Sequence, residues 1–157
     1  MVCYHSRMAH SLARAIFHIV FSTKNRERLL GDSIREKLFA YIAVVGRDMK
    51  CEVYRVGGMP DHVHVAIDLG RNISLAEFTK KIKQSISLWI KQQSPEFQAF
   101  SWQEGYGAFS VSQTHLPQLI SYIQAQEEHH KTTSFQDEFR KLLEKNGVVV
   151  EENHIWG

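Results

Sequence analysis

Two histidines, His62 and His64, stand one residue apart in the run DHVHVAID. Alternating polar and apolar side chains are typical of a half-buried strand, whose successive side chains point to opposite faces. The two imidazoles therefore share one face, about 7 Å apart along the strand, while Val63, Val65 and Ile67 form an apolar face. Two imidazoles on one face can bind a metal ion, but a third ligand must come from another segment. Histidines that only hydrogen-bond to backbone are the alternative interpretation.

A helix near the C-terminus offers the next polar side chains. The apolar spacing predicts this helix from about Leu116 to His130. Tyr122 and Gln126 are four residues apart and so stack on one face, roughly a third of a turn from the apolar stripe. A tyrosine placed there can face a site on the sheet, and a half-buried tyrosine with a solvated hydroxyl is the alternative. The residues at 127–130, EEHH, lack the spacing of a helical zinc motif.

Composition and charge exclude several classes of protein. The chain has 157 residues, of which 43% are hydrophobic, so residues 1–157 are expected to form a single domain. Residues 1–12 are expected to be a poorly ordered extension. The formal net charge of +2 is too small to name a partner. Two cysteines without a CxxC pair indicate neither a disulfide framework nor a zinc ribbon. The apolar run at 15–21 is too short to span a membrane, so we expect a cytoplasmic protein.

The remaining pattern predicts alternating strands and helices. Strands are expected at 15–23, 51–56 and around His62 and His64, followed by two short strands within 100–111. Helices are expected at about 33–49, 75–93, 116–130 and 135–145. This order favours a ferredoxin-like α+β fold, in which an antiparallel sheet has helices packed mainly on one face.

Four separated segments together resemble a known family. They are STKNR at 22–26, MPDHVH at 59–64, FSWQEGYGAFSV at 100–111 and YIQAQEEHH at 122–130. In sequence and order they resemble the single-tyrosine HUH transposases, named for a histidine-hydrophobic-histidine pair. This family serves the smallest bacterial insertion sequences and includes transposases associated with repetitive extragenic palindromes (REPs). The similarity extends from about residue 15 to residue 156.

The resemblance implies a role for each candidate residue. His62 and His64 match the family's metal-binding pair, Gln126 matches its third metal ligand, and Tyr122 matches its nucleophile. The implied reaction cleaves and rejoins single-stranded DNA beside a hairpin, through a 5′-phosphotyrosine, in a homodimer. The implied metal is Mg²⁺ or Mn²⁺, and imidazole ligands suit Mn²⁺ better.

Basic residues give the expected DNA contacts. Lys80, Lys83 and Lys91 lie on one face of the helix at 75–93, which family members turn towards DNA. Lys24 and Arg26, in the charged loop after the first strand, are also assigned to DNA binding. A solvated helix face is the alternative interpretation of the lysines.

Two other functions are compatible with the same residues. One is a domesticated protein that binds or cleaves palindromic hairpins without transposition. The other is an unrelated metal-dependent hydrolase, in which water attacks the substrate and Tyr122 is incidental.

Overall fold

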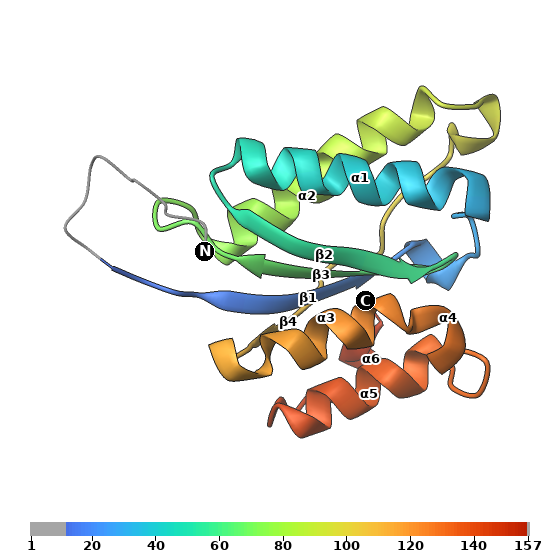
Figure 1. The fold of residues 1–157 in the computed structure, drawn as a ribbon. Helices are drawn as coiled ribbons and strands as arrows, with labels where there is room; N and C mark the ends of the chain where they lie inside the picture. The colour runs from blue at the N-terminus through green and yellow to red at the C-terminus, as the bar shows by residue number, and fades with distance from the viewer. Residues whose placement is uncertain (1–11, 157) are drawn as a thin grey trace.

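The computed structural model describes residues 12–156 (Figure 1). A four-stranded antiparallel sheet has the spatial order β2-β3-β1-β4. The strands are β1 (Ile16–Ser22), β2 (Glu52–Met59), β3 (His62–Asp68) and β4 (Gly107–Ser110). With α1 (Asp32–Asp48) between β1 and β2, and α2 (Leu75–Lys91) between β3 and β4, the element order is that of a ferredoxin-like fold. The predicted α+β class is confirmed. Apart from Leu12, the expected N-terminal extension lies outside the described residues.

Helices cover both faces of the sheet. Figure 1 shows α1 and α2 on one face and the C-terminal helices on the other. The latter are α3 (Leu116–Gln124), α4 (Gln126–His129), α5 (Phe135–Lys145) and α6 (Glu152–Ile155). The expected placement mainly on one face therefore holds for α1 and α2 only. The reason is that the second face carries apolar side chains of its own: Val20 and Phe109 pack with Phe135, and Ala66 packs with Ile123.

The main core lies between the sheet and the first two helices. Val63, Val65 and Ile67 of β3 are at most 1% exposed and pack with Phe78 and other apolar residues of α1 and α2. The alternation predicted for this strand is thus confirmed. Helix α2 begins at a capping box, in which the Ser74 hydroxyl and the Glu77 carboxylate each bind the other residue's backbone N–H.

Two segments differ from their predicted boundaries. Only one strand, β4, forms within 100–111, because Trp102 makes no more than an isolated bridge to Thr23. The helix expected at 116–130 is divided at Ala125, whose φ and ψ are −92° and 17°. Hydrogen bonds from His129 N to Ala125 O and from His130 N to Gln126 O continue the helical course beyond that break.

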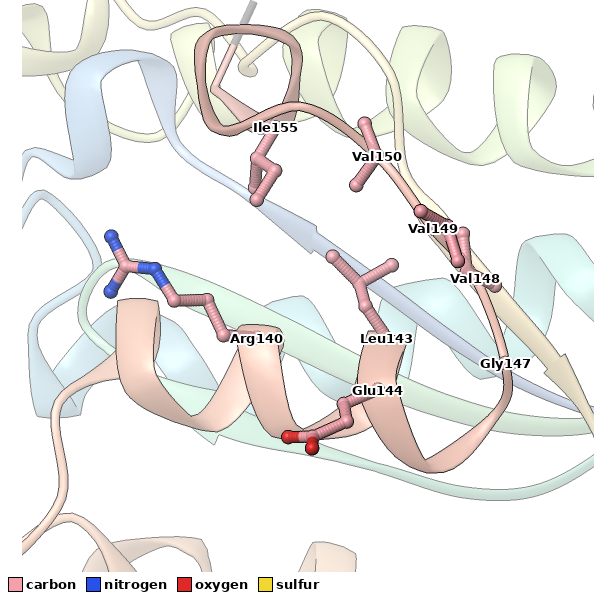
Figure 2. Close-up of a pocket in the computed structure, with 8 residues that line it drawn as sticks. All are labelled: Arg140, Leu143, Glu144, Gly147, Val148, Val149, Val150 and Ile155. Carbon is pink, nitrogen blue, oxygen red and sulfur yellow. The ribbon is translucent and has the colours of Figure 1, made fainter.

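The C-terminal segment folds back over α5. Together they form a pocket of about 320 Å³, in which Leu143 and Ile155 face each other across the gap (Figure 2). No predicted site residue lines this pocket. Within residues 12–156, no helix has both the length and the apolar character that a membrane crossing requires.

Candidate functional site

Strand β3 places both histidines under the C-terminal helices. His62 and His64 are 0% exposed, and their neighbours on β1 are Ser22 and Val20. Their ring centroids are 5.1 Å apart. The two imidazoles share the face of the sheet opposite the main core, as the alternation predicted.

Helices α3 and α4 bring the next two side chains over this face. Gln126 is buried, and its Oε1 lies 3.0 Å from His62 Nε2. The Tyr122 ring is half-buried and meets the His64 ring edge-on, with centroids 5.7 Å apart. This approach depends on Gly57 in β2, where a Cβ atom would lie 2.7 Å from the Ile123 carbonyl oxygen. Four residues expected to act together, from β3 and the α3–α4 helices, therefore meet in space.

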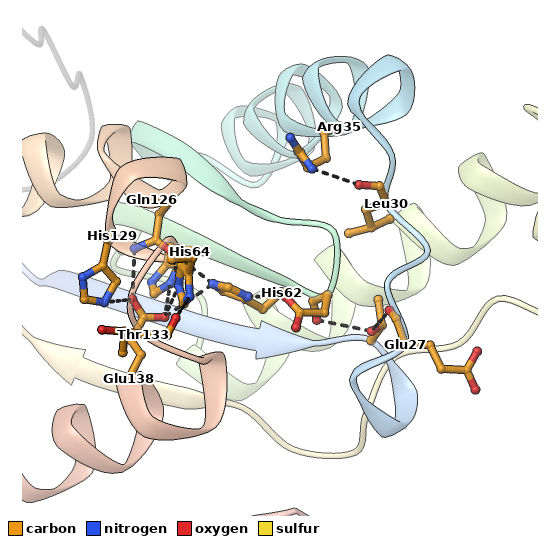
Figure 3. A network of polar contacts seen from close by, with 12 residues as sticks. Glu27, Leu30, Arg35, His62, His64, Gln126, His129, Thr133 and Glu138 are labelled. Atoms are coloured by element: carbon orange, nitrogen blue, oxygen red, sulfur yellow. Dashed lines mark hydrogen bonds and ion pairs between the residues drawn. The ribbon is translucent and has the colours of Figure 1, made fainter.

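Two further residues complete the cluster, and the sequence predicted neither of them. Glu138, in the first turn of α5, is 2% exposed. Its Oε1 lies 3.0 Å from His64 Nε2, 3.1 Å from His130 Nε2 and 3.4 Å from His62 Nε2 (Figure 3). His130 follows Gln126 by four residues, a helical spacing that places both side chains on one face. The spacing from Gln126 could have indicated His130 from the sequence, whereas no sequence pattern indicated Glu138.

The other carboxylate oxygen of Glu138 contacts the predicted nucleophile. The Tyr122 hydroxyl donates a hydrogen bond to Glu138 Oε2, and Gln126 Nε2 donates to the same oxygen at 3.0 Å. Burial and the negative Glu138 both raise the pKa of Tyr122 above its ordinary value. His129 Nε2 lies 3.2 Å from Glu138 Oε2, but in a geometry that makes no hydrogen bond.

The hydrogen bonds of the Nδ1 atoms show which ring nitrogens point into the cluster. His62 Nδ1 lies 2.7 Å from the Asp61 carboxylate, and His130 Nδ1 lies 2.7 Å from the Thr133 carbonyl. Both partners are acceptors, so each Nδ1 donates its proton to that partner and each Nε2 points into the cluster. The Gln126 amide is oriented by its bond to Glu138, so its oxygen faces the Nε2 atoms of His62 and His130. Once their Nε2 atoms are deprotonated, these rings and the amide oxygen present several ligand atoms to one cation.

A metal ion fits this donor set. One nitrogen from each of His62, His64 and His130 and one oxygen of Glu138 lie within 4.8 Å of one another. Metal-binding histidines usually donate their outer ring N–H to a carboxylate or a backbone carbonyl. The partner of His64 Nδ1 is instead an imidazole nitrogen, His18 Nε2, at 2.7 Å.

The charges in the cluster are strongly perturbed. Burial lowers the pKa of His62, but hydrogen bonds to Asp61 and Glu138 outweigh burial and raise it to about 9. Burial would raise the pKa of Glu138, yet its contacts with His130, His62 and His64 hold it well below the ordinary range. Burial lowers the pKa of His18 to about 3, so its ring is neutral. The centre therefore holds a buried carboxylate that attracts a cation.

The predicted DNA contacts lie in two places. Lys80, Lys83 and Lys91 are on α2, across the sheet from the histidines of the same chain (Figure 1). The Lys83 ammonium is bound to the Gln103 and Gly105 carbonyls, and burial lowers its pKa to about 8.

Lys24 and Arg26 lie closer to the cluster. They follow β1, whose last residue, Ser22, pairs with His62. Lys24 is exposed, and the Arg26 guanidinium lies 4.8 Å from the centroid of the Trp156 ring. The structure thus brings these two residues to the histidine end of the sheet and leaves the three lysines of α2 on the other face.

Comparison with known proteins gives the family. The sequence matches the profile of IS200-like transposases over residues 11–126. The chain belongs to this family. Its activity is therefore that of a transposase, an enzyme that cleaves DNA and transfers strands. The match includes His62, His64, Tyr122 and Gln126 and ends before His130 and Glu138, which lie outside it. No curated protein matches the sequence.

Solved structures show the same fold at low sequence identity. A protein from Deinococcus radiodurans R1 described as a candidate transposase is 20% identical, with a TM-score of 0.58 over 76% of this chain and 95% of the other. A REP-associated tyrosine transposase bound to a REP hairpin is 17% identical, with a TM-score of 0.58 over 83% of this chain and 74% of the other. Transposases of this family typically use a divalent metal, and the cluster around Glu138 is compatible with that use.

Proposed function

We propose that this transposase uses Tyr122 as its nucleophile and forms a covalent 5′-phosphotyrosine with single-stranded DNA. The supporting observation is that Glu138 holds the Tyr122 hydroxyl with one oxygen and meets the Nε2 atoms of three histidines with the other. A nucleophile and a set of metal donors are thus joined by a single carboxylate.

The bond changes follow from this arrangement. The Tyr122 oxygen attacks phosphorus, the bond to the 3′ oxygen breaks, and the 3′ oxygen takes up a proton from water to leave as a hydroxyl. Forming phenolate at neutral pH from an ordinary tyrosine, with a pKa near 10, costs roughly 4 kcal/mol. Glu138 raises that cost for a free phenolate, so the phenol proton is lost to water as the oxygen–phosphorus bond forms and not before it. The phosphotyrosine conserves the bond energy, and a second 3′-hydroxyl can reverse the reaction without ATP.

His62, His64 and Gln126 are the proposed ligands of the divalent ion, Mg²⁺ or Mn²⁺. When bound, such an ion neutralises phosphate charge as a Lewis acid. The chain's own contribution is to fix the His62 ring through Asp61 and the His64 ring through His18, and to shield the donors from solvent, since all three side chains are at most 1% exposed.

Single-stranded DNA with a hairpin is the proposed substrate, because a similar fold has been solved with a REP hairpin bound. Lys24, Arg26, Lys80, Lys83 and Lys91 are the proposed DNA contacts, and the proposed assembly is a homodimer acting on the bacterial nucleoid. Tyr122 meets the histidines of its own chain here. In the proposed dimer, each subunit uses the Tyr122 of its own chain.

The test combines labelled single-stranded DNA carrying a hairpin with protein and Mn²⁺ or Mg²⁺. A covalent protein–DNA adduct should appear, and it should be lost after chelation with EDTA and in Tyr122→Phe. Tyr106→Phe, at an exposed tyrosine outside the cluster, is the matched control and should retain the adduct. Cleavage that survives Tyr122→Phe would indicate attack by water. Hairpin binding without cleavage by the unmodified chain would indicate a binding protein.

A further inference from the structure

His130 lies deeper in the cluster than its place at the end of α4 indicates. Its side chain is 6% exposed, and its Nε2 is 3.0 Å from Gln126 Oε1 and 3.1 Å from Glu138 Oε1. The Thr133 carbonyl oxygen accepts a hydrogen bond from Nδ1, which fixes the ring orientation. The ring stands edge-on to His62, with centroids 4.6 Å apart. The Nδ1 of His130 is thus hydrogen-bonded on the outer side of the ring, as is that of His62. The Nε2 atoms of both rings are directed at the same two oxygens, Gln126 Oε1 and Glu138 Oε1.

We propose that His130 and Glu138 are additional metal ligands, and that the site therefore prefers a transition-metal dication, represented by Mn²⁺, over Mg²⁺. This inference rests on the proposed function of His62, His64 and Gln126 as metal ligands and extends that set. It goes beyond the family match, which ends at Gln126.

The donor chemistry determines the preference. The extended set has three imidazole nitrogens, one amide oxygen and one carboxylate oxygen. Imidazole suits first-row transition metals, whereas Mg²⁺ favours oxygen ligands and keeps several waters. Adjacent donors in an octahedral site with metal–ligand bonds near 2.1 Å lie roughly 3 Å apart. The Nε2 and oxygen atoms here are already 3.0–3.4 Å apart in five pairs.

Glu138 has a second consequence for the reaction. Its Oε1 faces the imidazole nitrogens, while its Oε2 accepts from Tyr122 and Gln126. A carboxylate that binds the ion through Oε1 keeps Oε2 on the tyrosine. Glu138 therefore positions the nucleophile relative to the ion. In Glu138→Gln both metal affinity and adduct formation should decrease, because the carboxylate charge is lost from both contacts.

The experiment measures metal binding directly. Purified full-length protein is titrated with Mn²⁺ and with Mg²⁺ by calorimetry, and nitrogen couplings to bound Mn²⁺ are counted by pulsed electron paramagnetic resonance. Mn²⁺ should bind at least about tenfold more tightly than Mg²⁺, with three coupled imidazole nitrogens. His130→Gln should retain two of these nitrogens and weaken Mn²⁺ binding by about tenfold or more, on the scale seen for perturbed metal sites. His154→Gln, at an exposed histidine outside the cluster, should change neither value.

The outcomes distinguish this inference from the proposed function. Two coupled nitrogens in the unmodified protein, with equal Mn²⁺ affinity in His130→Gln, would overturn this inference and leave the proposed function standing. Mn²⁺ binding that is unaffected by His64→Ala would instead contradict the metal role in the proposed function. The nitrogen count in the unmodified protein requires no variant, so it decides the matter even if a substitution at position 130 prevents folding.

Discussion

The two faces of the sheet are built by the same strands yet bury different chemistry. On the α1–α2 face, Val63 and Val65 are at most 1% exposed and pack in the apolar main core. On the α3–α5 face, His62, His64 and Glu138 are 0–2% exposed and meet one another. Burying polar groups costs free energy unless they are hydrogen-bonded or bind a metal. We infer that the first face supplies stability and the second face accepts a stability cost for a reactive site.

The largest expected effect distinguishes two neighbouring residues of β3 that point to opposite faces of the sheet. His64→Ala should reduce metal-dependent cleavage by about 10³-fold, since metal stabilisation is worth several kcal/mol and about 1.4 kcal/mol corresponds to tenfold in rate. Val65→Ala, one residue away on the opposite face, should lower the free energy of unfolding and leave the cleavage rate of folded protein unchanged. The measurement is a single-turnover cleavage rate for each variant. Comparable rate losses in both would contradict the division between faces.

The next effect concerns stability alone. Phe78→Ala removes a 1% exposed ring from the main core and should lower the free energy of unfolding by about 3–5 kcal/mol. Leu88→Ala, at a 70% exposed position on the same helix, should change it by less than about 0.5 kcal/mol. Urea denaturation gives both values. An unchanged unfolding midpoint in Phe78→Ala would show that this face is not the main source of stability.

A glycine tests how closely the reactive face is packed. Gly57→Ala places a Cβ 2.7 Å from the Ile123 carbonyl oxygen, so α3 must move away from β2. Overpacking of this kind costs about 1–3 kcal/mol, and a 1 Å displacement of a catalytic group can cost on the order of 10²-fold in rate. Gly31→Ala, with nothing within 4 Å of its Cβ, is the control. Full cleavage activity in Gly57→Ala would mean that Tyr122 does not depend on this contact.

The smallest effect compares two helix caps. The hydroxyls of Ser74 and Ser134 cap α2 and α5, and each substitution with alanine should cost about 1 kcal/mol of stability. Only Ser134→Ala loosens the helix that carries Glu138, so only this variant should also weaken Mn²⁺ binding. Thermal unfolding and calorimetry are the measurements. An equal loss of Mn²⁺ affinity in Ser74→Ala would show that the faces are coupled.

Local patterns predicted the features that a few neighbouring residues determine. The alternation around His62 and His64 was sufficient to place both rings on one face and the valines on the other. The helix expected at 75–93 is observed at 75–91, because the Ser74 cap and an apolar stripe specify it locally. His62, His64, Tyr122 and Gln126 were expected together, and the fold does bring them together.

Features determined by contacts between distant segments were not predicted. Glu138 is 74 residues from His64 along the chain. An acidic residue in the first turn of a helix is common for electrostatic reasons alone, so nothing marked Glu138 as part of a site. The break at Ala125 also has no local signal, because alanine is the best helix former. The second layer of helices depends on apolar residues of β1, β3 and β4 that become one surface only after the sheet forms.

Identifying the residue that becomes linked to DNA decides whether Tyr122 is the nucleophile. The adduct formed with single-stranded hairpin DNA and Mn²⁺ is digested with nuclease and protease, and the peptide carrying the nucleotide is identified by mass spectrometry. We expect a nucleotide joined through its 5′-phosphate to Tyr122. A nucleotide on any other tyrosine, or cleavage that leaves no protein-linked nucleotide, would contradict it.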